Sequence, residues 1–65
     1  MKNFLLFILF TNLIFSQQKE TFVNANEKYN SGDFVSAIQK YNEIIINGDH
    51  SPEVYFNLGN AYYKL

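Results

Sequence analysis

Cysteine, tryptophan and arginine are absent from this 65-residue sequence, and proline and histidine each occur once. Without cysteine the chain can form neither a disulfide nor a lipid-modified N-terminal cysteine, so packing alone must stabilise it. The one histidine, His50, follows Asp49 in an expected loop, whereas a metal site needs three or four ligands. With no arginine, no lysine cluster and a formal net charge of −1, nucleic-acid binding is not expected.

Catalytic motifs are also missing from the sequence. The three glycines, Gly32, Gly48 and Gly59, stand singly, so no phosphate-binding loop is present. The acidic residues are spread along separate segments and are typical of solvated helix faces. We therefore expect neither an enzyme nor a cofactor.

The first sixteen residues have the layout of a secretory signal peptide. Lys2 provides a positive charge, residues 4–10 are an unbroken apolar run, and Ser16 precedes a polar stretch that begins at Gln17. Residues 1–16 are predicted to be a signal peptide cleaved after Ser16, leaving a mature chain of residues 17–65. The alternatives are an uncleaved membrane anchor, although a spanning helix needs about 20 apolar residues, and a buried helix.

Three helices are predicted in the mature chain. The first covers about Lys19–Asn30 and ends at Ser31-Gly32, where glycine can adopt the left-handed conformation that closes a helix. The second begins at Asp33, a good N-cap residue, and ends at Asn47-Gly48. Its apolar residues recur at intervals of three and four and form one stripe: Phe34, Ala37, Ile38, Tyr41, Ile44 and Ile45.

The third predicted helix has the clearest start signal, with Ser51 at the cap, Pro52 at the first helical position and Glu53 in the first turn. Its apolar residues cover more than one face, which indicates neighbours on two sides. They are Val54, Tyr55, Phe56, Leu58, Ala61, Tyr62 and Leu65. A competing interpretation makes residues 44–46 a short strand, because β-branched runs favour sheets.

An internal repeat links the first and third helices. At a shift of 34 residues three positions are identical and one matches small for small. These pairs are Phe22 with Phe56, Asn26 with Asn60, Tyr29 with Tyr63, and Ala25 with Gly59. A period of 34 residues is that of the tetratricopeptide helix-turn-helix unit.

The residues themselves resemble the tetratricopeptide-repeat family. Its first-helix motif is matched by Tyr55, Leu58, Gly59 and Tyr62, and its turn and second-helix motif by Gly32, Phe34, Ala37, Tyr41 and Ile44. The resemblance implies an all-α fold, an antiparallel helix-turn-helix solenoid. Repeat 1 covers about residues 18–51, and a truncated repeat 2 covers residues 52–65. Thr21, Asn24 and Lys28 depart from the motif, either because this repeat caps the array or because it is degenerate.

A narrower resemblance combines the signal peptide with the run of residues 51–65. Together they are similar to the start of the BatE-type aerotolerance proteins of bacteria. That resemblance implies periplasmic repeats, a downstream membrane helix and SH3-like region, and von Willebrand A-type membrane partners. The implied function is an exported scaffold for protein–protein interaction in the periplasm or cell envelope.

The identical positions form the candidate binding site. Phe22, Asn26 and Tyr29 lie on one stripe of the first helix, and Phe56, Asn60 and Tyr63 lie on the equivalent stripe of the third. In the family this stripe lines a concave groove, so these six residues are the predicted peptide-binding groove. Alternatively, the aromatic side chains pack against the neighbouring first helix.

Two other functions remain open at the level of sequence. The chain can be a small secreted peptide, a signal or toxin complete at 65 residues. It can also be the N-terminal part of an enzyme whose catalytic domain lies downstream. Against the first, repeat arrays generally need three or more units to bury a continuous core.

Overall fold

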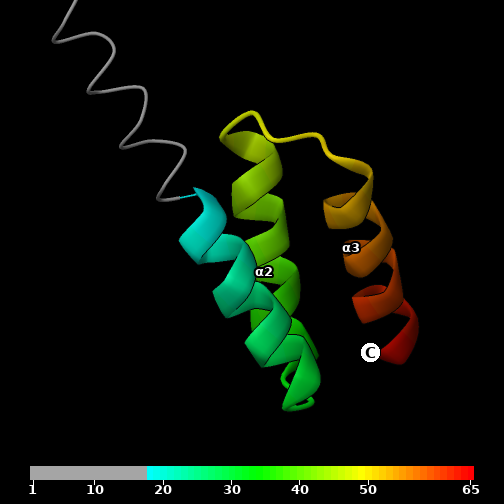
Figure 1. Cartoon of the computed structure of the whole chain (residues 1–65). Helices are drawn as coiled ribbons and strands as arrows, with labels where there is room; N and C mark the ends of the chain where they lie inside the picture. The colour runs from blue at the N-terminus through cyan, green and yellow to red at the C-terminus, as the bar shows by residue number, and fades with distance from the viewer. Residues whose placement is uncertain (1–17) are drawn as a thin grey trace, which may run out of the picture.

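The computed structural model describes residues 18–65, which form three helices and no strand. A first helix covers residues 18–30, α2 covers Phe34–Ile46 and α3 covers Pro52–Lys64. Successive helices run in opposite directions, as Figure 1 shows. The all-α prediction is confirmed for this part of the chain, and residues 44–46 belong to α2 rather than to a strand. The predicted signal peptide of residues 1–16 and its cleavage after Ser16 lie outside the described residues.

The turn between helix 18–30 and α2 is built from the residues that the sequence indicated. Gly32 has φ of +85°, its N–H donates to Tyr29 O at 3.1 Å, and the Asp33 N–H donates to Lys28 O at 2.9 Å. This pair of bonds is the Schellman motif, which satisfies carbonyl groups at a helix end. Asp33 then caps α2, because its Oδ1 accepts the Ser36 N–H at 3.2 Å.

The end of α2 repeats the same geometry. Gly48 has φ of +105°, its N–H donates to Ile45 O at 3.0 Å, and the Asp49 N–H donates to Ile44 O at 3.1 Å. The two helix ends predicted at glycine are therefore confirmed, each closed by a Schellman motif.

The start of α3 differs from the prediction in one respect. Ser51 occupies the N-cap position and Pro52 the first helical position, but the Ser51 side chain makes no capping hydrogen bond. Instead the Ser51 N–H donates to Asp49 Oδ1 at 3.0 Å, so the carboxylate holds the turn before the helix. Glu53 lies in the first turn as predicted, where its charge complements the helix dipole.

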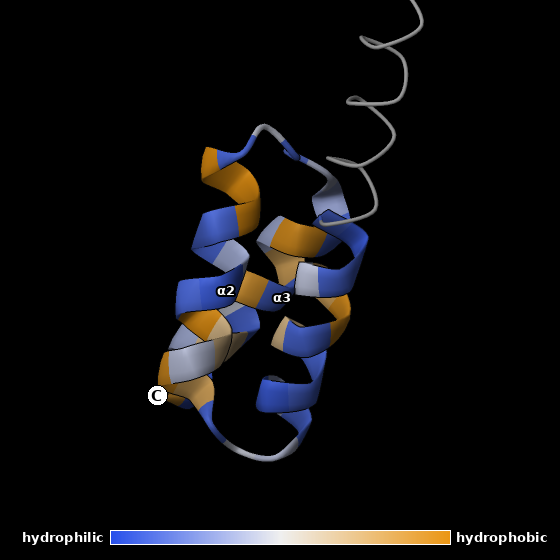
Figure 2. Ribbon diagram, turned by 90° about the vertical axis from the view of Figure 1, so that its left-hand side faces the viewer, coloured by the Kyte–Doolittle hydropathy of each residue, from blue (hydrophilic) through white to orange (hydrophobic). Residues whose placement is uncertain are grey.

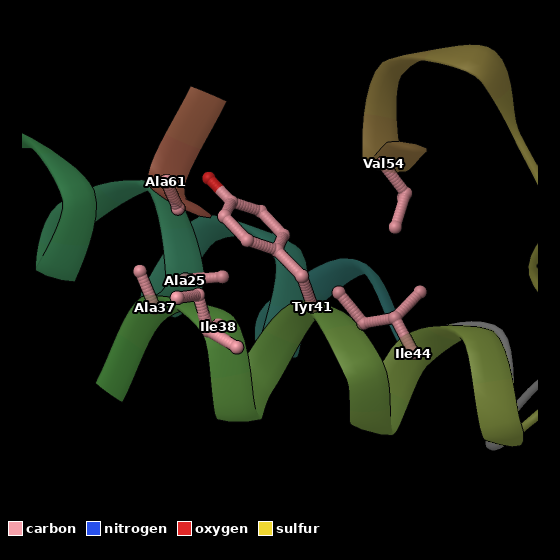
Figure 3. Close-up of a cluster of buried hydrophobic side chains, with 7 residues drawn as sticks. All are labelled: Ala25, Ala37, Ile38, Tyr41, Ile44, Val54 and Ala61. Carbon is pink, nitrogen blue, oxygen red and sulfur yellow. The ribbon is translucent and has the colours of Figure 1, made fainter. Parts of the chain in front are cut away.

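The core lies where the three helices meet, and Figure 3 shows its members. They are Ala25, Ala37, Ile38, Tyr41, Ile44, Val54 and Ala61. Ala25 and Ala37 are wholly buried, so small side chains allow helix 18–30 and α2 to approach closely. Four of the six residues in the predicted stripe of α2 are buried, and Phe34 and Ile45 are partly buried. Figure 2 shows the resulting alternation of apolar and polar bands along the ribbon.

The third helix buries only part of its apolar surface. Val54 and Ala61 are buried, whereas Tyr55, Phe56 and Tyr62 are exposed. Among the helices of residues 18–65, none is long and apolar enough to cross a membrane.

Candidate functional site

A hollow of about 490 Å³ lies between helix 18–30 and α3, and we call it the interhelix hollow. Two helices supply its walls, helix 18–30 on one side and the first half of α3 on the other. It is lined by Phe22, Asn26, Pro52, Glu53, Phe56 and Asn57. Three of the six residues predicted from the internal repeat, Phe22, Asn26 and Phe56, are therefore brought together around one hollow.

Asn26, which lines this hollow, is the centre of a polar network. Its Oδ1 accepts a hydrogen bond from the Tyr41 hydroxyl of α2 and another, at 3.1 Å, from Asn57 Nδ2 of α3. A single side-chain oxygen thus joins all three helices. Burial raises the pKa of the Tyr41 hydroxyl, and the Asn57 amide has a smaller opposing effect. A buried tyrosine hydroxyl needs a polar partner, and here Asn26 provides it.

The aromatic residues of helix 18–30 pack against α2. The Phe22 ring meets the Tyr41 ring edge-on, with centroids 6.2 Å apart, and the Tyr29 ring meets the Phe34 ring at 5.4 Å. Both arrangements are the edge-to-face geometry that aromatic pairs prefer. Phe22 therefore serves the core and the hollow together, whereas Tyr29 does not line the hollow.

The three predicted residues of α3 lie in different surroundings. Phe56 is 70% exposed at the hollow, Asn60 is partly buried outside its lining, and Tyr63 is 90% exposed. Of these three residues, Phe56 lines the interhelix hollow. Phe56 is the large apolar side chain available for a contact at the hollow.

A second hollow of about 300 Å³ adjoins the first, since both are lined by Phe22 and Glu53. Its other lining residues are Gln18, Lys19, Asp49, Ser51 and Val54. Two carboxylates and one ammonium group line this smaller hollow. It extends the interhelix hollow toward the start of helix 18–30.

His50 contacts an aromatic residue rather than a cluster of ligands. Its Nδ1 lies 2.8 Å from the Tyr55 hydroxyl, and the two rings stack with centroids 6.2 Å apart. In the described part of the chain no three residues of the types that ligate metals come together. The sequence did not predict this contact, because it depends on the path of the loop before α3.

The sequence also did not predict Asn57 and the Tyr41 hydroxyl as members of the site. One signal was available: Tyr41 lies on the buried stripe of its helix, and a buried hydroxyl requires a partner from another helix. The identity of that partner depends on how the helices cross.

Comparison with family models, with curated proteins and with solved structures gives no match for this chain.

Proposed function

We propose that the chain is an exported scaffold of the tetratricopeptide type, which binds an extended segment of another protein in the interhelix hollow. The observation that carries this proposal is the hollow itself, in which the exposed Phe56 ring and the partly buried Phe22 ring lie beside side-chain amides. Aromatic side chains contribute strongly to protein interfaces, and amides can both donate to and accept from a peptide backbone.

The amides have hydrogen-bonding capacity left for a ligand. Both hydrogen bonds described for Asn26 end on its Oδ1, so its Nδ2 can donate to a partner carbonyl. Asn57 uses Nδ2 toward Asn26, so its Oδ1 can accept a partner N–H. An extended backbone offers both groups, whereas a helix uses them internally. Phe22 and Phe56 would then hold an apolar side chain of that segment.

The repeat interpretation is supported by the match between helix 18–30 and α3. The positions aligned by the shift of 34 residues lie within these two helices, Phe22 and Asn26 in the first and Phe56 and Asn60 in α3. Ala25 is wholly buried under α2, but a side chain added at the equivalent Gly59 would meet nothing within 4 Å. In a tetratricopeptide array a further helix would cover this face of α3.

The place of action and the partner rest on the signal-peptide layout and on the family resemblance. We propose export through residues 1–16, cleavage after Ser16, and action in the periplasm or cell envelope. The BatE-type resemblance favours membrane proteins with von Willebrand A-type domains as partners, within an aerotolerance system. N-terminal sequencing of the secreted chain tests export, because the mature product should begin at Gln17; retention of residue 1 would contradict cleavage.

The binding proposal is tested by selecting peptides from a random library on the full chain and measuring their affinity by fluorescence anisotropy. The informative variant is Phe56→Ala, which removes a ring from the hollow at little cost to the core. The matched control is Tyr63→Ala, an exposed aromatic residue of the same helix outside the hollow. Asn26→Ala is less suitable, because it also removes the acceptor of the buried Tyr41 hydroxyl.

We expect Phe56→Ala to weaken binding about tenfold or more, and Tyr63→Ala to leave it within about twofold, as is usual for a ring at the centre and one outside an interface. Failure to select any peptide would argue against a binding groove. Equal affinities for the two variants would remove the interhelix hollow as its location.

A further inference from the structure

The junction between α2 and α3 contains Asn47-Gly48, the one asparagine in the sequence that is followed by glycine. Both residues are exposed, and Asn47 is the C-cap residue of α2. The dipeptide Asn47-Gly48 is prone to chemical degradation. Asparagine is among the residues that degrade most readily, and glycine has no Cβ to hinder attack by its backbone nitrogen.

The reaction is deamidation through a cyclic imide, and its only co-reactant is water. The Gly48 backbone nitrogen attacks Asn47 Cγ and loses its proton, while the side-chain amide leaves as ammonia. Water then opens the resulting succinimide at either carbonyl. The products are aspartate, or isoaspartate with the main chain running through the former side chain. No oxidation or reduction takes place.

The fold holds the attacking nitrogen away from this reaction. The Gly48 N–H donates to Ile45 O at 3.0 Å, and the following Asp49 N–H donates to Ile44 O at 3.1 Å. Asn47 is fixed from two further sides, since its N–H donates to Glu43 O and its carbonyl accepts from Gln18 Nε2 at 2.9 Å. Ring closure needs the Gly48 nitrogen and rotation about Asn47, so these bonds must break first.

We propose that Asn47-Gly48 is a deamidation site that the C-cap of α2 suppresses, so that its modification marks chains in which the α2–α3 junction has opened. The product keeps the junction open. A carboxylate at residue 47 is unfavourable at the negative end of the α2 dipole and lies two positions before Asp49. Isoaspartate also lengthens the main chain by one methylene, so the bond from Asp49 to Ile44 no longer fits.

The test compares deamidation rates in the full 65-residue chain and in a synthetic peptide of residues 44–51, at mildly alkaline pH. Mass spectrometry follows the exchange of amide for carboxyl, and an isoaspartyl methyltransferase labels the rearranged product. Each of the two Schellman bonds is worth a factor of about 2–12 in an opening equilibrium. The folded chain should therefore react at least about tenfold more slowly than the peptide. A tenfold difference corresponds to about 1.4 kcal/mol in the opening equilibrium.

Two variants separate cap protection from other effects. Ile44→Ala removes a wholly buried side chain next to the cap and should raise the rate toward that of the peptide, whether the variant unfolds or only frays. Val35→Ala, at an exposed position in the first turn of the same helix, should leave the rate unchanged. Circular dichroism is recorded at each time point. Equal rates in the folded chain and the peptide, or no acceleration in Ile44→Ala, would overturn the proposal.

Discussion

Removal of the Asn26 amide tests whether one side-chain oxygen holds the three helices together. Asn26→Ala leaves the hydroxyl of the wholly buried Tyr41 without its acceptor, and an unsatisfied buried polar group costs about 1–3 kcal/mol. The same change removes the bond from Asn57, worth about 0.5–1.5 kcal/mol. We therefore expect the free energy of unfolding to fall by about 1.5–4.5 kcal/mol.

The companion variant Tyr41→Phe removes the hydroxyl but leaves the bond between Asn57 and Asn26. It should cost only about 0.5–1.5 kcal/mol, since no buried donor is left unpaired. In the Tyr41→Phe background, Asn26→Ala no longer strands a hydroxyl, so its cost should fall by about 1–3 kcal/mol. This non-additivity is the signature of the network.

The measurement is urea or thermal unfolding of the full chain, followed by circular dichroism. Domains of this size have only about 0.05–0.15 kcal/mol of stability per residue, so trimethylamine N-oxide is added to keep weak variants folded. Asn60→Ala, at the equivalent repeat position of α3, is the control and should change stability by less than about 0.5 kcal/mol. An equal cost of Asn26→Ala with and without the Tyr41 hydroxyl would refute the reasoning.

Three further predictions concern titration and backbone conformation. Hydrogen bonding to Ser36 lowers the pKa of Asp33 from 3.8. The stabilising effect of the Asp33 carboxylate is therefore present above that pH and is lost as the pH falls through the folded-state pKa. Asp33→Asn keeps an N-cap residue but should remove this acid sensitivity, as measured by thermal unfolding at a series of pH values. Burial raises the pKa of Tyr41 above 10.0, so stability should be lost as the pH rises through the folded-state pKa, and Tyr41→Phe should abolish that loss in alkaline unfolding curves. Gly48→Ala should destabilise the chain by about 1–3 kcal/mol, because Gly48 has φ of +105°. Gly59→Ala should stabilise the chain by about 0.5–1 kcal/mol, because Gly59 lies in mid-helix with open space around it. Thermal unfolding that ranks the two variants in the opposite order would contradict this account.

The helices and their ends could be predicted from the sequence because their signals are local. Gly32 and Gly48 end helices, and Asp33 caps one, through bonds between residues at most five positions apart. The buried stripe of α2 follows from the helical period in the same way. Ser51 was predicted as the cap of α3 by residue type, but the nearby Asp49 carboxylate holds the Ser51 N–H instead.

The site could be predicted only in part, because its geometry depends on contacts between distant residues. The internal repeat indicated Phe22, Asn26 and Phe56, which do line one hollow. It did not indicate that Tyr29 packs against Phe34, since the repeat aligns helices without fixing how they cross. The partners of Asn26 lie 15 and 31 positions away in the sequence, beyond the reach of any periodicity.

The oxygen shared by Asn26, Tyr41 and Asn57 also restricts how this sequence can diverge. Loss of the asparagine alone strands a buried hydroxyl, whereas loss of the hydroxyl first makes the later change cheaper. Stable descendants are therefore expected to replace Tyr41 by phenylalanine before they lose Asn26. Once Asn26 is lost, Asn57 no longer has its hydrogen-bond acceptor, so other residues can occupy position 57. In a collection of diverged chains these three positions should covary, even though each belongs to a different helix.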